Sequence, residues 1–160
     1  LGDVYKRQAL SSIGQYDVAA SPLQMAMVAA GIANDGVLME PYLTKSVRAA
    51  NLQTVWTHKD TPMSTPMTRE SAKQLQQMMV SVVNNGTGRN ARIDGVTVGG
   101  KTGTAQTSPD KPPYAWFVGW SDKPKVAVAV FVESSNTERS EIAGGRLGAP
   151  IARDVIEALR

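Results

Sequence analysis

The residues best suited to chemistry lie in one glycine-rich stretch, GVTVGGKTGTAQ, at residues 95–106. Lys101 supplies a cation, and Thr102 and Thr104 supply hydroxyl donors beside it. Gly103 keeps one position of the backbone bare, so that a ligand can approach closely. A cation and hydroxyl donors next to an open backbone suit the binding of an anionic group, either a phosphate or a carboxylate.

The phosphate alternative rests on residues 95–102, which match the nucleotide-binding loop G-x-x-x-x-G-K-[ST]. Such a loop needs a buried strand before it and a helix after it, because the N–H groups of the helix N-terminus bind the anion. The preceding residues 88–94, GRNARID, are too polar for a buried parallel strand. Pro109, Pro112 and Pro113 follow too soon to leave room for a helix. We therefore interpret the phosphate-loop match as a coincidence.

Interpreted as a strand, the same stretch forms a peptide-binding edge. Gly99 and Gly100 carry no side chains that would obstruct an approaching chain, and Lys101 places a charge beside that edge. A peptide can add to such an edge as a further strand while its carboxylate meets the lysine and threonine groups. The tripeptide K-T-G alone favours an ordinary strand with a solvent-facing lysine, so its context must decide.

Composition narrows the possible chemistry. The 160-residue chain has no cysteine, which excludes thiol catalysis, cysteine zinc sites and disulfides. Its single histidine, His58, lies in the polar run THKD, and we expect it in an exposed loop and not in a Ser-His-Asp triad. We expect no metal and no cofactor. The net charge is +3, but the basic residues are scattered, so we expect no nucleic-acid partner. The longest aliphatic run, residues 126–132, is too short to span a bilayer, so a membrane-anchored protein would need its anchor upstream of this chain.

The first half of the chain is predicted to hold two main helices. One begins with Ser21 as N-cap and Pro22 in the first turn, and it ends at Asn34. Thr68 caps the other helix. The apolar stripe of that second helix, predicted to pack in the core, consists of Leu75, Met78, Met79, Val82 and Val83. Between the helices, YLTKSV and LQTVW indicate two short strands.

The second half is β-rich. Residues 96–98, 115–120 and 126–132 are predicted strands, and antiparallel pairing follows because no helix-length crossover separates them. Pro150 begins a last helix. Its predicted sheet-facing residues are Ile151, Val155, Ile156 and Leu159. The fold class is thus α+β, an antiparallel sheet packed with helices. Residues 1–8, LGDVYKRQ, join oddly to the rest and are predicted to be a non-native or fragmentary end, with the domain in residues 9–160.

Several segments in order carry a family resemblance. They are GQYD, SPLQMAMVAAGIANDGVLMEPYL, NNGTG, GGKTGTAQ, YAWFVGW and GAPIARDVIEAL, and K-T-G is itself a short signature of serine penicillin-recognising enzymes. Together they resemble the C-terminal part of the transpeptidase domain of penicillin-binding proteins, in particular monofunctional class B enzymes of actinobacterial type. The resemblance covers the chain from about Ser12 to Arg160. It implies part of a penicillin-binding and serine β-lactamase-like transpeptidase fold.

The resemblance also implies a function. A D,D-transpeptidase of this family crosslinks peptidoglycan stem peptides ending in D-alanyl-D-alanine through a serine acyl-enzyme, and β-lactams acylate the same serine. By this resemblance Lys101, Thr102 and Gly103 belong to the catalytic site, with Lys101 supplying positive potential. Thr102 and Thr104 would hold the substrate carboxylate, and the backbone N–H of Thr104 would be one oxyanion-hole donor. The implied location is extracytoplasmic, at the outer face of the bacterial plasma membrane, and the partners are stem peptides and β-lactams.

The nucleophile that the resemblance requires is not identified in this chain. In the family it is the serine of S-x-x-K, a second motif is S-x-N, and both precede K-T-G. Residues 108–111, SPDK, match the first pattern and residues 134–136, SSN, match the second, but both follow Lys101. The prolines after Lys111 also exclude the helix that would present a serine and a lysine together. We interpret both matches as coincidences and expect the nucleophile upstream of residue 1, which predicts that the chain alone is an inactive fragment.

Two other function classes stay open. One is a non-catalytic peptide-binding or β-lactam-sensing relative on the same scaffold, which an upstream S-x-x-K and S-x-N would argue against. The other is a serine β-lactamase relative, although GQYDVAASPLQMAMVAAGIANDG resembles the transpeptidases more. Gln15 and Asp17 could form a loop near the site, but scaffolding of the following helix is favoured. Trp116 is expected in the core, because Phe117 and Val118 flank it.

Overall fold

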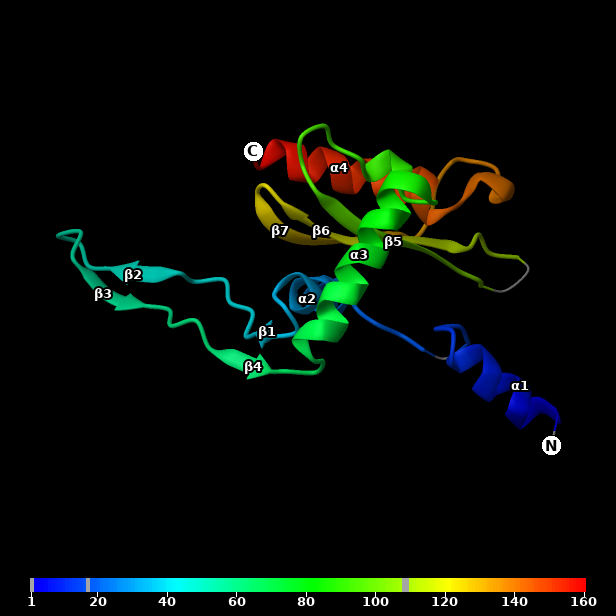
Figure 1. Cartoon of the computed structure of the whole chain (residues 1–160), viewed down its shortest axis with the longest axis horizontal. Coiled ribbons are helices and arrows are strands. Elements are labelled where there is room, and N and C mark those ends of the chain that lie inside the picture. Colours follow the sequence, from blue (N-terminus) through cyan, green and yellow to red (C-terminus); the bar gives the residue numbers. More distant parts are fainter. Residues whose placement is uncertain (1, 17, 108–109) are drawn as a thin grey trace.

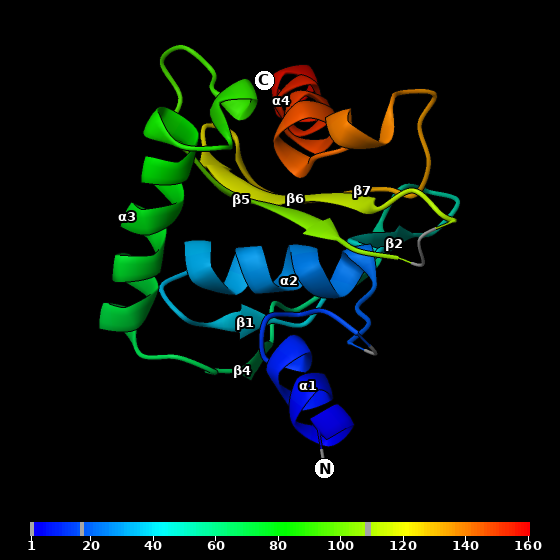
Figure 2. The same cartoon turned by 90° about the vertical axis from the view of Figure 1, so that its right-hand side faces the viewer.

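A three-stranded antiparallel sheet lies between two helices. The computed structural model describes residues 2–16, 18–107 and 110–160. Its main helices are α1 (Gly2–Ser11), α2 (Pro22–Ala33), α3 (Arg69–Asn85) and α4 (Ala149–Ala158). The sheet consists of β5 (Val98–Ala105), β6 (Tyr114–Asp122) and β7 (Lys125–Val132) in that order. Helices α2 and α4 cover opposite faces of the sheet, and α3 stands beside β5 (Figures 1 and 2). The predicted antiparallel α+β architecture is confirmed.

The alternation of β6 supplies both parts of the core. Phe117 is fully buried and packs with Ala152 and Ile156 of α4. Trp120 points to the other face, because residues an odd number apart on a strand face opposite ways, and it packs with Ile32 of α2 and with α3. The aromatic residues of the middle strand therefore hold helices on both faces of the sheet.

The helix starts are local features, and the structure confirms them. The Ser21 hydroxyl accepts a hydrogen bond from the Gln24 N–H at 3.2 Å, while the Gln24 side chain accepts one from the Ser21 N–H at 2.8 Å. This reciprocal capping box satisfies backbone donors that the first turn of α2 leaves free. Thr68 caps α3 by accepting from the Ser71 N–H at 3.1 Å.

The predicted apolar stripe of α3 is only partly right. Met79 and Val83 are buried, but Met78 is 61% exposed. Consecutive residues on a helix point about 100° apart, so α3 cannot bury both methionines against one side of the sheet. The stripe therefore includes Met79 and excludes Met78.

The predicted sheet-facing side of α4 is wrong for three of its four residues. Ile156 is buried, but Ile151, Val155 and Leu159 are 45%, 43% and 59% exposed. The buried face consists of Ala149, Ala152 and Ile156. Small alanine side chains bring the α4 backbone close to the sheet, so the bulkier residues lie outside the contact.

Trp116 also differs from its expected place. It is half-buried, with its ring centroid 4.7 Å from that of Phe131 on β7. The fully buried ring of this segment is Phe117, the next residue along β6. The local signal of neighbouring apolar residues could not decide which of two opposite-facing side chains enters the core.

Between α2 and α3 the chain forms an extended arm that points away from the body (Figure 1). Its strands are β1 (Leu38–Met39), β2 (Ser46–Arg48), β3 (Thr54–Thr57) and β4 (Pro62–Ser64), paired as β1 with β4 and β2 with β3. The two predicted strands correspond to β2 and β3. His58 lies in a loop directly after β3, as expected, but it is half-buried and not exposed, with its ring stacked on Tyr42 at a centroid distance of 3.6 Å.

Helix α1 passes through residue 8 without a break, and the non-native origin of residues 1–8 stays a prediction. Among the described residues no helix is both long and apolar enough to cross a membrane.

Candidate active site

The K-T-G residues lie on the edge strand of the sheet. Strand β5 pairs with β6 so that Lys101 lies opposite Val118, and Thr104 lies opposite Ala115. Within the described ranges no other strand pairs with β5, so its second edge is open for an added strand. Strand β5 begins at Val98, the last residue of the predicted strand 96–98, and continues through the K-T-G residues to Ala105, which agrees with the interpretation of this stretch as a strand.

One contact shows to which side the backbone N–H and C=O groups of Thr104 in β5 point. The Thr104 carbonyl accepts a hydrogen bond from the Gln15 side chain at 3.2 Å, on the side away from β6. In an antiparallel pair the N–H and C=O of one residue point to the same side, so the Thr104 N–H also points to the open edge. Thr102 lies two residues away and has the same direction, because the pattern repeats every second residue.

The side chains alternate between the two faces. Thr102 and Thr104 lie in register with Phe117 and Ala115, on the face that α4 covers. The side chain of Lys101 is exposed and curls back to the strand, where its Nζ donates to the Thr102 carbonyl at 2.8 Å. A cation and two hydroxyls thus meet at the open edge.

The glycines before Lys101 have a role that sequence reasoning missed. A Cβ on Gly99 would collide with the Trp120 ring, and one on Gly100 would collide with the Phe117 ring. The bare backbone therefore makes room for aromatic rings from β6, one on each face of the sheet. Ring packing, and not access for a ligand, requires these two glycines.

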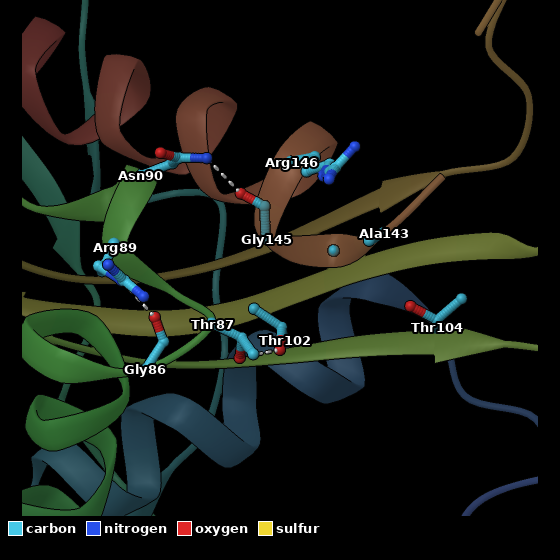
Figure 3. A pocket seen from close by; sticks show the side chains of 10 residues that line it. Gly86, Thr87, Arg89, Asn90, Thr102, Thr104, Ala143, Gly145 and Arg146 are labelled. Atoms are coloured by element: carbon cyan, nitrogen blue, oxygen red, sulfur yellow. Dashed lines mark hydrogen bonds between the residues drawn. The ribbon is translucent and has the colours of Figure 1, made fainter. Parts of the chain in front are cut away.

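A cavity of about 480 Å³ opens beside the two threonines (Figure 3). Its walls are β5, the turn after α3 (residues 86–90) and the π-helical turn η3 (Gly144–Gly148). The side chains that line it include Thr87, Arg89, Asn90, Thr102, Thr104 and Arg146. Arg146 is paired with Glu141, and Arg89 donates to the Gly86 carbonyl at 3.1 Å. The charged residues that line the cavity, Arg89 and Arg146, are both arginines, which suits an anionic group.

Hydrogen bonds join the walls of this cavity. The hydroxyls of Thr87 and Thr102 are 2.7 Å apart, and Asn90 Nδ2 donates to the Gly145 carbonyl at 2.8 Å (Figure 3). The turn after α3 therefore contacts both β5 and η3. Residues 84–88 (NNGTG) and 144–145 (GG) are of types that favour turns, but no local pattern in the sequence indicates that they border the site.

Close backbone packing fixes η3 against the sheet. A Cβ on Gly144 would collide with the Trp116 carbonyl oxygen, and one on Gly145 would collide with the Thr87 carbonyl oxygen. Only glycine allows this approach. The two glycines therefore form one wall of the cavity as well as the turn into the last helix.

Gln15 reaches the same edge of β5. Besides its bond to the Thr104 carbonyl, its Oε1 accepts from the Gln106 N–H at 3.1 Å. Scaffolding of the following helix had been favoured for this residue, so its place at the site corrects that interpretation. Asp17, considered with it, lies outside the described residues.

The described residues of the two coincidental motifs do not line the cavity. Ser108 lies outside the described residues, and no helix follows at Lys111. Ser134 is exposed after the end of β7 and does not line the cavity. In the described part of the chain no cluster of His, Asp or Glu side chains suits a metal ion.

Comparison with known proteins decides the family. A family model described as the penicillin binding protein transpeptidase domain matches residues 4–157. The chain belongs to this family. The predicted resemblance and the predicted transpeptidase fold are therefore confirmed.

Relatives that this chain resembles include mycobacterial proteins. Peptidoglycan D,D-transpeptidase PbpA of Mycolicibacterium smegmatis is 42% identical over 154 residues, covering 93% of this chain and 31% of the relative. PbpA of Mycobacterium tuberculosis is 40% identical with the same coverage. The chain thus spans about a third of the length of these relatives.

Solved transpeptidase structures agree. Penicillin-binding protein A from M. tuberculosis, as a ceftriaxone acyl-enzyme complex, matches with a TM-score of 0.84 at 39% identity, covering 93% of this chain and 34% of that structure. The D,D-transpeptidase domain of a peptidoglycan glycosyltransferase from Eggerthella lenta matches with a TM-score of 0.73 at 34% identity, covering 88% and 33%.

Proposed function

We propose that this chain forms the K-T-G wall of the active site of a peptidoglycan D,D-transpeptidase that also binds β-lactams. The observation that supports this most directly is the open edge of β5, where Lys101 and the hydroxyls of Thr102 and Thr104 meet beside an arginine-lined cavity. Family membership supports the reaction class, and the relatives named above are D,D-transpeptidases.

In this proposal the stem peptide adds to the open edge of β5. An extended peptide bonds to the outward N–H and C=O groups of an edge strand. Its terminal carboxylate is held by the Thr102 and Thr104 hydroxyls and by the charge of Lys101, since hydrogen bonds to ionised groups are the stronger ones. Gly103 keeps the position between the threonines free of a side chain.

The outward N–H of Thr104 then supplies one oxyanion-hole donor. A serine hydroxyl attacks the carbonyl of the penultimate D-alanine, the carbonyl oxygen takes up negative charge, and the terminal D-alanine leaves with a proton. The amine of a second stem peptide resolves the acyl-enzyme into the crosslink. Removal of one such donor from other enzymes lowers the rate by roughly 10²–10³.

The nucleophilic serine is supplied from outside residues 1–160 in this proposal. The support is that the chain covers only 31% of PbpA from M. smegmatis, and that the described S-x-N match lies away from the cavity. The location that follows is extracytoplasmic, at the outer face of the plasma membrane, where the peptidoglycan substrate is found.

A chimeric enzyme tests the proposal. The chain replaces the matching 154-residue segment of M. smegmatis PbpA, and acylation by a fluorescent penicillin is followed by gel and by mass. Lys101→Ala is expected to slow acylation by about 10- to 100-fold, because a charge-assisted interaction with the ligand carboxylate is lost.

Lys111→Ala is the matched control, because Lys111 is an exposed lysine of the coincidental S-x-x-K match. It should leave acylation unchanged. If Lys101→Ala is acylated as fast as the parent chimera, the assignment of the K-T-G wall is wrong. If the chimera is acylated but never crosslinks stem peptides, the non-catalytic β-lactam-sensing alternative is supported instead.

A further inference from the structure

The side chain of Gln15 occupies the open edge of β5. Its Nε2 donates to the Thr104 carbonyl at 3.2 Å, and its Oε1 accepts from the Gln106 N–H at 3.1 Å. Gln15 is half-buried, whereas its described neighbours from Ser11 to Ala20 are exposed. The Gln15 side chain therefore turns inward from an exposed loop, and two hydrogen bonds hold it against the edge of β5.

The two hydrogen bonds reproduce the pattern of an added strand. In a parallel pair each residue lies opposite one residue of the other strand. Its N–H donates to the carbonyl of the residue before that opposite residue, and its carbonyl accepts from the N–H of the residue after it. The Gln15 amide donates to Thr104 and accepts from Gln106, the residues on either side of Ala105. It therefore stands where a peptide unit of a bound strand would lie, and a bound peptide and this amide cannot occupy the place together.

The loop that carries Gln15 is built to hold this position. The backbone N–H of Gln15 donates to the carbonyl of Leu10, near the end of α1, at 3.0 Å. Gly14 and Tyr16, on either side, have φ of 75° and 66°. A left-handed conformation costs a tyrosine about 1 kcal/mol or more, and such outliers gather at functional sites.

We propose that Gln15 is a specificity gate, an amide that occupies the substrate edge until a ligand with its own peptide group displaces it. This inference rests on the proposed function, since it concerns the same edge of β5. A ligand that brings both an N–H donor and a carbonyl acceptor replaces both hydrogen bonds. A ligand without an amide N–H leaves Gln15 in place and gains nothing from the Thr104 carbonyl.

Two β-lactams separate these cases. Penicillin G carries an acylamino group, which is a peptide unit, whereas imipenem carries a hydroxyethyl group in its place. Both form acyl-enzyme complexes with penicillin-binding protein A from M. tuberculosis. Gating by Gln15 acts on the first compound and not on the second.

The test uses Gln15→Met in the chimera with M. smegmatis PbpA, because methionine keeps the length of the side chain and removes both amide groups. We expect the second-order rate of acylation by penicillin G to rise by at least about two- to tenfold, the factor for each of the two ordinary hydrogen bonds that the variant removes. The rate with imipenem should not change. Gln77→Met, at an exposed position of α3, is the matched control and should change neither rate.

Each outcome decides the question. Equal rates for Gln15→Met and the parent with both compounds overturn the gate but leave the proposed function standing, provided that Lys101→Ala still slows acylation. A loss of rate with both compounds assigns Gln15 a supporting role and also overturns the gate. A parent chimera that penicillin does not acylate overturns the proposed function, and the gate with it.

Amide exchange in the 160-residue chain checks the contact without acylation or a chimera. The Gln106 N–H should exchange about two- to tenfold faster in Gln15→Met than in the parent chain, because its acceptor is removed. The Gly103 N–H, within the paired part of β5, serves as the internal reference. Equal exchange at Gln106 overturns the contact on which the gate depends.

Discussion

The hydroxyls of Thr87 and Thr102 lie 2.7 Å apart, which joins the turn after α3 to the K-T-G strand. A threonine hydroxyl has one proton and rotates to suit its partners. The contact with Thr87 therefore restricts the direction in which Thr102 presents its oxygen to the cavity (Figure 3). In the proposed function Thr87 is a positioning residue, because it acts through Thr102 and not on the substrate.

Replacement of Thr87 tests this positioning role. Thr87→Val keeps the shape and removes the hydroxyl, and it should lower the acylation rate of the chimera by about two- to tenfold, the effect of one hydrogen bond. Thr87→Ser keeps the hydroxyl and should restore most of the rate. The assay is the penicillin acylation described above. Equal rates for the valine and serine variants would show that the contact has no functional role.

Gly144 should tolerate no side chain. A Cβ there would meet the carbonyl oxygen of Trp116 and lie 2.7 Å from that of Gly103, so backbone on both sides must move. Gly144→Ala is expected to lower the free energy of unfolding by about 3 kcal/mol, at the upper end of overpacking effects. Urea denaturation of the chain followed by circular dichroism measures the change.

Gly31→Ala is the matched control for that experiment. Gly31 lies inside α2, and a Cβ there would approach only the Leu38 side chain, at 3.7 Å, which is an ordinary contact. Alanine should stabilise the helix by about 0.5–1 kcal/mol, because glycine loses more backbone entropy on folding. Destabilisation by both substitutions to a similar extent would contradict the close packing assigned to Gly144.

Phe117 and Met78 should differ strongly, although Met78 was expected in the core. Phe117→Ala removes a fully buried ring that also covers Gly100, and it should cost about 3–5 kcal/mol of stability. Met78 is 61% exposed, so Met78→Ala should change stability by less than about 0.5 kcal/mol. Thermal and urea unfolding of the two variants measure the difference. A large loss in Met78→Ala would mean that α3 packs through a different face.

The chain alone should not react covalently with penicillin. A serine hydroxyl is weakly nucleophilic unless a base activates it. Ser134 is exposed on a loop after β7, and its sequence match to a motif brings no helix-borne lysine with it. Incubation of the 160-residue chain with penicillin G should leave its intact mass unchanged, while the chimera gains one adduct. Stoichiometric adduct on Ser134 would contradict this interpretation.

Much of the site could be predicted from local pattern. The strand propensity around Lys101, the prolines that follow and the polar residues before it excluded a phosphate loop, and the structure has a strand there. Predictions failed where two neighbouring residues competed for one place. Met78 and Met79 are the same residue type, and Trp116 and Phe117 are both aromatic. Only the position of the packing partner decides which member of each pair is buried.

The sequence by itself determined the capped starts of α2 and α3, the antiparallel strands and the family, because these depend on residues near one another in the chain or on ordered motifs. The tertiary structure alone decided that Gln15 reaches Thr104 across 89 positions and that Thr87 reaches Thr102 across 15. It also decided that aromatic rings of β6 cover Gly99 and Gly100. These contacts depend on how helices and sheet pack together, which local spacing does not encode.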